Sequence, residues 1–169
     1  MAPLVRRSWA PRGQTPILYQ RTSSHKKVSV IAALCIAPKR DRIHLYFRIH
    51  SDANINALCV SAFLNTLKRQ LKKRVVLVWD RFLPHRAKIV QSVIHKRCIH
   101  SFFFPPYAPE LNPVEHVWGY LKMNPLANLT AVDVEALADT TRCNGRSIQR
   151  KQNLLRSFVK HAPLPLRLK

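Results

Sequence analysis

Two carboxylates, Asp80 and Glu115, stand at positions from which side chains can converge on a metal ion. The chain has only eight acidic residues against 29 Lys and Arg, so the placement of each acid is informative. Asp80 follows the apolar run Val75–Trp79, and the carboxyl end of a central strand lies at the ligand-binding edge of an α/β sheet. Glu115 lies one helix and one strand further along, in the first turn of an expected helix. We therefore expect both carboxylates at the same sheet edge.

Oxygen ligands of this kind bind Mg²⁺ or Mn²⁺. Two such ions about 3.5–4 Å apart can activate an attacking hydroxyl and stabilise the leaving oxygen of a phosphodiester. Asp80 and Glu115 are thus the predicted catalytic residues and metal ligands. Each also has a structural interpretation: Asp80 could simply end a strand, and Glu115 could complete a capping box with Asn112, ahead of Pro113. Spacing alone leaves both interpretations open.

The elements that must position these acids follow from apolar patterning. By residue range they are strands Val28–Ile36 and Ile43–Ile49, a helix capped by Ser51 or Asp52, strand Arg74–Trp79, a helix after Pro84, strand Ile99–Phe104 and helix Asn112–Met123. This order predicts an α/β fold with a mixed sheet flanked by helices. Weaker patterns after Asn124 indicate one or two further helices.

The charge of the chain indicates a polyanionic partner. The net charge is +21, and DNA, RNA and an anionic membrane surface all fit that value. The longest apolar stretch, Val28–Ala37, is too short to span a bilayer. The four cysteines form no CxxC pair, which argues against a zinc site or a disulfide framework and favours reduced core thiols in the cytosol.

Two segments closely resemble one known family. VVLVWDRFLPHRA at positions 75–87 and FFFPPYAPELNPVEHVWGYLK at positions 102–122 resemble the DDE endonuclease domain of mariner-type transposases, in the bacterial insertion-sequence branch. Pro105–Pro113 is the most specific block, and RSWAPRGQTP at positions 7–16 also looks like this family. The resemblance covers roughly residues 5–123.

The resemblance implies a ribonuclease-H-like fold with three acids that bind two divalent metals and cut and rejoin DNA. Asp80 matches the second acid and Glu115 the third. Residues 1–123 would form a partial DDE endonuclease domain, and residues 124–169 a helical C-terminal tail.

The first acid of the family has no counterpart here. It lies on a first strand, shortly before the segment that corresponds to positions 7–16, whereas no Asp or Glu precedes Asp41 in this sequence. Asp41 falls in the expected hairpin turn and Asp52 at a helix start, so neither is a substitute. Arg81 stands where many relatives have Asn. We expect the first strand to be missing, and the chain to be a partial or inactive transposase fragment that does not cleave DNA alone.

The expected partner is double-stranded DNA, both transposon ends and target, with no membrane association. The predicted DNA contacts are Arg12, Lys26, Lys27, Arg81, His85, Arg86 and Lys122. A homodimer, or association with an N-terminal transposase fragment, fits the missing strand, and the expected location is the cytoplasm, on the nucleoid. Two alternatives remain: a non-enzymatic basic DNA-binding remnant, and an RNA-processing nuclease of the same fold.

Overall fold

The computed structural model describes residues 7, 9–15, 17, 27–129 and 133–168. The elements follow in the order β1 (Val28–Ile36), β2 (Ile43–Ser51), α1 (Ala57–Leu71), β3 (Val75–Trp79), η1 (Leu83–Arg86), α2 (Lys88–Lys96), β4 (Ile99–Phe103), η2 (Pro109–Leu111), α3 (Pro113–Met123), α4 (Val134–Gln149) and α5 (Gln152–His161). The predicted order of strands and helices is confirmed, including two helices after Asn124.

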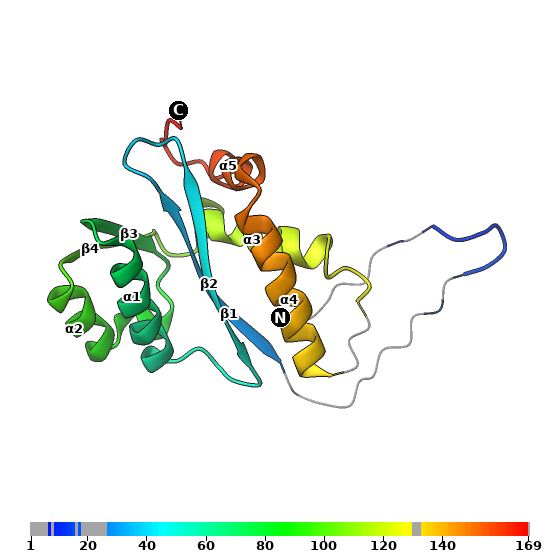
Figure 1. The fold of residues 1–169 in the computed structure, drawn as a ribbon, viewed down its shortest axis with the longest axis horizontal. Helices are drawn as coiled ribbons and strands as arrows, with labels where there is room; N and C mark the ends of the chain where they lie inside the picture. Colours follow the sequence, from blue (N-terminus) through cyan, green and yellow to red (C-terminus); the bar gives the residue numbers. More distant parts are fainter. Residues whose placement is uncertain (1–6, 8, 16, 18–26, 130–132, 169) are drawn as a thin grey trace.

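The predicted hairpin is formed by β1 and β2. They pair antiparallel, from Val28 opposite Ser51 to Ile36 opposite Ile43. The connecting turn is closed by a hydrogen bond from the Ala37 N–H to the Arg42 carbonyl at 2.9 Å. In Figure 1 this hairpin runs through the middle of the molecule, with α1, α2, β3 and β4 on one side and α3 and α4 on the other.

The other two strands, β3 and β4, pair parallel, from Val75 opposite Ile99 to Trp79 opposite Phe103. The sequence predicted one mixed sheet, but the described strands form two separate two-stranded sheets. Among the described residues no strand lies between β1 and β3 to join them. The overall α/β class is as expected, and the sheet is divided where a further strand would connect its two halves.

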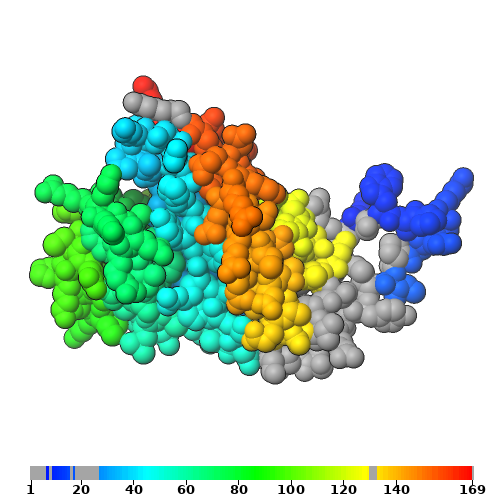
Figure 2. All heavy atoms as spheres, viewed as in Figure 1, coloured from blue at the N-terminus to red at the C-terminus, as the bar shows by residue number. Residues whose placement is uncertain are grey.

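Each sheet has its own hydrophobic core. The hairpin packs against α3, α4 and α5 through buried residues that include Ile43, Val117 and Leu155, whereas α1 and α2 cover β3 and β4 through Val60, Val90 and others. Figure 2 shows the cyan side chains of the hairpin between the green part that contains α1 and α2 and the orange helix α4.

The C-terminal helices are tied to the hairpin by polar contacts as well as by apolar packing. The Gln149 amide donates to the Leu45 carbonyl at 2.6 Å. The Gln152 amide both donates to the Ile43 carbonyl at 2.9 Å and accepts from the Ile43 N–H at 3.2 Å. The expected helical tail after residue 123 therefore packs into the same core as the first two strands.

The predicted cap of the first helix is wrong. Ser51 is the last residue of β2 and pairs with Val28, and Asp52 has a positive φ of 50°. The actual N-cap of α1 is Asn56, whose side chain accepts from the Cys59 N–H at 2.9 Å. Pairing with β1 extends β2 past the point where the sequence pattern ended it, so the helix starts later.

The cysteines fit the predicted thiols only in part. All four are free, but Cys98 and Cys143 are exposed, while Cys35 and Cys59 are partly buried. The interpretation of Cys98 and Cys143 as core residues is therefore wrong. Over the part of the chain that the structure describes, no helix combines the length and apolar character needed to cross a membrane.

One packing contact between α4 and β2 gives a stability prediction. A Cβ at Gly145 would lie 2.5 Å from Cζ of the Phe47 ring. Gly145→Ala should therefore destabilise the protein by roughly 1–3 kcal/mol through overpacking, although alanine favours a helix. Gly119→Ala in α3 meets nothing within 4 Å and should stabilise by up to about 1 kcal/mol. Urea unfolding midpoints measure both, and equal shifts of the same sign would contradict this packing.

Candidate active site

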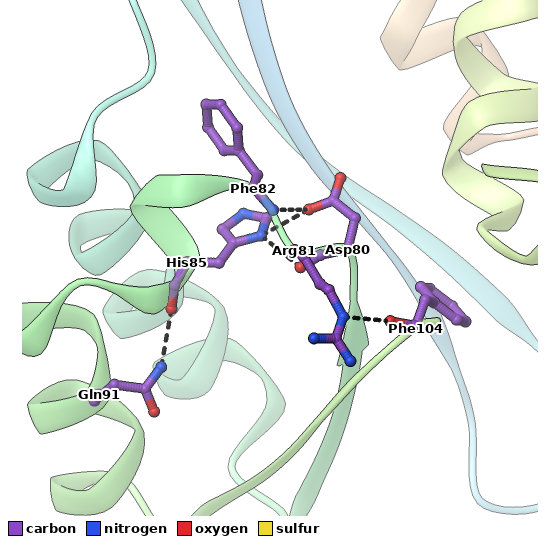
Figure 3. Close-up of polar contacts among 6 residues, drawn as sticks. All are labelled: Asp80, Arg81, Phe82, His85, Gln91 and Phe104. Atoms are coloured by element: carbon purple, nitrogen blue, oxygen red, sulfur yellow. Dashed lines mark hydrogen bonds and ion pairs between the residues drawn. The ribbon is translucent and has the colours of Figure 1, made fainter. Parts of the chain in front are cut away.

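Asp80 lies directly after β3, where its carboxylate closes a local turn. Its Oδ1 accepts a hydrogen bond from the Phe82 N–H at 3.1 Å and lies 2.9 Å from His85 Nδ1, as Figure 3 shows. The side chain of Asp80 is 51% exposed. The carboxylate thus has one oxygen held by the protein while the group stays open to solvent.

His85 is fixed in place by contacts on several sides. Its ring stacks on Trp79 with centroids 4.3 Å apart and meets the edge of Phe82 at 5.4 Å. The Gln91 side chain donates to the His85 carbonyl at 2.9 Å. This packing gives His85 a definite orientation toward Asp80, so it is a positioning residue for that carboxylate.

The hydrogen bond from His85 lowers the pKa of Asp80 below its ordinary value. The hydrogen bond from the Phe82 N–H and the charge of protonated His85 act in the same direction, and partial desolvation of the carboxyl opposes them. Asp80 is therefore held in its ionised form, which is the form that binds cations.

Glu115 lies in the first turn of α3, at the position that its sequence context predicted. The helix is capped by the Asn112 side chain, which accepts from the Val114 N–H at 3.2 Å. The Asn112 N–H donates to the Pro109 carbonyl at 3.0 Å, so the reciprocal bond of a capping box does not form. Among the described residues the Glu115 carboxylate accepts no hydrogen bond, which removes the purely capping interpretation.

Partial desolvation raises the pKa of Glu115, and the negative charge of Asp80 raises it further. Lys122 and His116 act in the opposite direction. The effect of Asp80 follows from like charge, because a nearby carboxylate disfavours ionisation of Glu115. Asp80, Glu115, His85 and Lys122 all line one cavity. The structure thus brings the two acids to the same cavity.

The two acids provide oxygen ligands of the kind that a divalent metal prefers. Two carboxylates that line one cavity are a suitable oxygen pair for Mg²⁺, which is commonly bound through one or two carboxylates, water and substrate phosphates. The described residues contain no cluster of three His, Cys, Asp or Glu side chains that could hold an ion. The donor set thus fits an open metal site with two protein ligands.

The predicted DNA contacts divide into two groups. His85 and Lys122 line the cavity, whereas Arg12, Lys27, Arg81 and Arg86 are exposed outside it. Arg81 Nε donates to the Phe104 carbonyl at 3.1 Å, which ties the residue after Asp80 to the end of β4. Lys26 lies outside the described residues.

Sequence reasoning missed the structural role of His85. His85 lies shortly after Asp80 and directly after Pro84. This spacing indicates a turn that could bring the His85 side chain back to the Asp80 carboxylate. Trp118 is partly buried, packs against the core that contains Val117, and also lines the cavity.

Comparison with solved structures places the fold among the ribonuclease-H-like catalytic domains of transposases. A Mos1 mariner paired-end complex with Mn matches with a TM-score of 0.68 at 16% identity, over 96% of this chain and 48% of that one. A Mos1 strand transfer complex matches with a TM-score of 0.64 at 17% identity, over 96% and 48%. The Mos1 catalytic domain alone matches with a TM-score of 0.55 at 14% identity, over 80% and 74%.

The chain thus spans about half the length of the Mos1 chains in those two complexes. A search of curated protein sequences found no match. The family described as DDE superfamily endonuclease matches residues 2–138. Because this match covers most of the sequence, the chain belongs to the DDE superfamily endonucleases.

The contact between His85 and Asp80 gives a prediction for titration. His85→Phe keeps an aromatic ring against Trp79 but removes the ring nitrogen, so the pKa of Asp80 should rise toward its ordinary value. Carboxyl ¹³C chemical shifts followed against pH measure this change. His100→Ala, at an exposed position of β4, is the control and should leave the pKa of Asp80 unchanged. An unaltered Asp80 titration in the His85 variant would show that the hydrogen bond is not made in solution.

Proposed function

We propose that this chain is the catalytic part of a protein that cuts and transfers DNA strands, with Asp80 and Glu115 as ligands for Mg²⁺ or Mn²⁺. The observation that carries the proposal is the convergence of the two acids. They come from the end of β3 and the start of α3, they line one cavity, and the charge of Asp80 raises the pKa of Glu115. Membership of the DDE superfamily endonucleases supports the same reaction class.

The side chains around the pair have separate tasks. His85 keeps Asp80 ionised and oriented, while Glu115 offers a carboxylate that no other protein group occupies in the described part of the chain. Lys122 lowers the pKa of Glu115 and supplies a positive charge to which a phosphate is attracted. A divalent cation bound here would polarise a phosphodiester and stabilise the charge that develops on its oxygens.

We propose double-stranded DNA as the substrate and the nucleoid as the location. The net charge of +21 provides attraction to phosphates that does not depend on sequence. Exposed basic residues lie on the segment that follows Asp80, beside the cavity in which the acids converge. The Mos1 structures that resemble this chain are complexes with transposon ends and a strand transfer complex, which supports the same class of substrate.

The metal pair is tested by conservative amide substitutions. Asp80→Asn and Glu115→Gln should each lower the affinity for Mn²⁺ by about tenfold or more, because each removes one of only two carboxylate ligands. Paramagnetic broadening of amide signals during Mn²⁺ titration measures the affinity. Asp139→Asn is the matched control, since Asp139 is an exposed acid that pairs with Arg142 on α4. Broadening that persists around β3 and α3 in both variants would place the metal elsewhere.

The second candidate function is DNA binding without chemistry. It is favoured by the large positive charge and by the absence of a three-ligand cluster among the described residues. Both candidates predict DNA binding that weakens steeply with salt. They differ in cleavage: the catalytic proposal requires metal-dependent nicking once the site has its full set of ligands, whereas the binding candidate predicts none.

The DNA interaction itself yields a separate prediction. The affinity for a duplex oligonucleotide should fall by at least about a hundredfold between 50 and 200 mM salt. Asp80→Asn and Glu115→Gln should leave this affinity within about twofold, because neither acid contacts a phosphate in the absence of metal. Fluorescence anisotropy measures both, and an affinity that does not change with salt would exclude a charge-driven interface.

A further inference from the structure

Basic side chains gather at the amino ends of β3 and β4. The helix α1 ends at Leu71, shortly before β3 begins at Val75, and α2 ends at Lys96, shortly before β4 begins at Ile99. Because β3 and β4 pair parallel, with Val75 opposite Ile99, both connecting turns lie at the same end of the sheet. We call this surface the basic patch. Its members, all exposed, are Arg69, Lys72, Lys73, Arg74, Lys96 and Arg97.

Hydrogen bonds to α1 hold the two turns of the basic patch together. Arg97 Nε donates to Asn65 Oδ1 at 2.8 Å, which joins the turn before β4 to α1. Lys68 Nζ donates to the Lys73 carbonyl, which ties the turn before β3 to the same helix. The patch is therefore one connected surface on a common support.

No acidic residue balances the basic patch. The sequence contains no Asp or Glu between Asp52 and Asp80 or between Asp80 and Glu110. In the part of the chain that the structure describes, the ion pairs lie elsewhere, at Asp80 and Asp139. The carboxyl ends of α1 and α2 supply about half a negative charge each, so roughly one negative charge faces six positive ones. Stabilisation of the two helix ends therefore accounts for only a small part of this charge.

The basic patch lies at the opposite end of the sheet from the candidate active site. Arg74 directly precedes β3 and Asp80 directly follows it. Their separation of 80 − 74 = 6 residues corresponds to about 20 Å along an extended strand. Arg81 and Arg86, which are also exposed, belong to the end that carries Asp80. The chain thus has positive surfaces at both ends of one small sheet.

The chemistry of the basic patch fits the phosphate backbone of a duplex. Positions 68–74 and 95–98, all of which the structure describes, include no exposed large apolar side chain. A helix that binds a membrane surface inserts apolar residues, and a single nucleic-acid strand is held by aromatic rings on which its bases stack. Lys and Arg contact duplex phosphates without either feature.

We propose that the basic patch binds a second segment of double-stranded DNA, distinct from the DNA that reaches the acids, so that one chain bridges two duplexes. The contacts are to phosphates and do not depend on base sequence. Repulsion among the six cations is relieved when phosphates neutralise them. The placement of the first duplex at Asp80 and Glu115, and the choice of DNA over RNA, rest on the proposed function, whereas the binding of a duplex to the patch does not.

The number of duplexes bound by each chain is the main test. The 169-residue chain is mixed with a duplex of about 12 base pairs, roughly 40 Å long, at about 100 mM salt. Analytical ultracentrifugation should give the mass of one chain with two duplexes. Two duplexes with different fluorophores should also diffuse together in fluorescence cross-correlation, and this signal should fall steeply as the salt concentration rises.

Two variants of equal charge separate the basic patch from the net charge of the chain. The patch variant carries Arg69→Gln, Lys72→Gln, Lys73→Gln and Arg74→Gln. The control variant carries Arg146→Gln, Arg150→Gln, Lys151→Gln and Lys160→Gln, at exposed positions of α4, α5 and the turn between them. Each has a net charge of 21 − 4 = +17. The patch variant should bind one duplex per chain and lose the cross-correlation, whereas the control variant should still bind two. Circular dichroism checks that both fold.

A measurement on the unaltered chain does not depend on how the variants fold. Exposed lysines are acetylated with an N-hydroxysuccinimide ester, and mass spectrometry gives the rate at each position. The duplex should slow acetylation of Lys72, Lys73 and Lys96 by about tenfold, because phosphate contacts withdraw their amines from the reagent. Lys151 and Lys160 should react at an unchanged rate.

Several results would overturn the proposal. These are one duplex per chain for the unaltered protein, equal losses in the two variants, or complexes in which two chains hold two duplexes. The first denies the second site, the second assigns binding to net charge, and the third assigns bridging to self-association. Binding to phosphatidylserine vesicles that only the patch variant loses, with DNA binding unchanged, would assign the patch to a membrane surface. An RNA duplex that binds the patch more tightly than DNA would assign it to RNA.

Failure of this proposal and failure of the proposed function give different results. If the patch variant loses the second duplex while Asp80→Asn and Glu115→Gln leave the affinity for Mn²⁺ unchanged, the patch stands and the metal site fails. If the chain binds a single duplex while both acid variants lose Mn²⁺, the patch is refuted and the metal site stands.

Discussion

The parallel pairing of β3 with β4 is the constraint on which the site depends. It aligns Trp79 with Phe103, and the Phe104 N–H continues the pairing to the Trp79 carbonyl at 2.8 Å. The chain must then turn away, and Asp80 satisfies that turn with its own carboxylate. Trp79 is covered by Phe103, at 5.8 Å between ring centroids, and by His85. The same stack that buries the end of the strand therefore also presents the histidine to the acid.

Local patterns predicted the elements well, because period and apolar runs depend on near neighbours in sequence. They failed where an outcome depends on a distant partner. The pairing of Ser51 with Val28 lengthened β2 and moved the cap of α1 to Asn56. The run Val28–Ile36 predicted a strand, but its apolar pattern contains no information about which strands lie beside it. The division of the sheet between β1 and β3 therefore could not be predicted from the sequence of either strand alone.

The candidate site was predictable to a similar degree. Asp80 and Glu115 were found from their positions after a strand and at a helix start, and the family resemblance gave them roles. The position of His85 depends on stacking against Trp79 and on the hydrogen bond from Gln91. Neither contact produces a periodic pattern in the sequence. The capping interpretation of Glu115 does not hold because the Asn112 N–H donates to the Pro109 carbonyl of η2 and not to Glu115. Competition for one backbone donor thus decided whether the carboxylate was available.

The division into two hydrophobic cores has a consequence for cooperativity. Asp80 follows a strand that packs with α1 and α2, whereas Glu115 belongs to α3, whose Val117 packs with the hairpin and the C-terminal helices. The two acids therefore belong to different packing units. The distance between the two carboxylates depends on how those units are placed relative to one another. Units of this kind can open with separate free energies. A local opening that loosens one core would separate the carboxylates before either unit unfolds. The site would therefore be among the first features lost on heating.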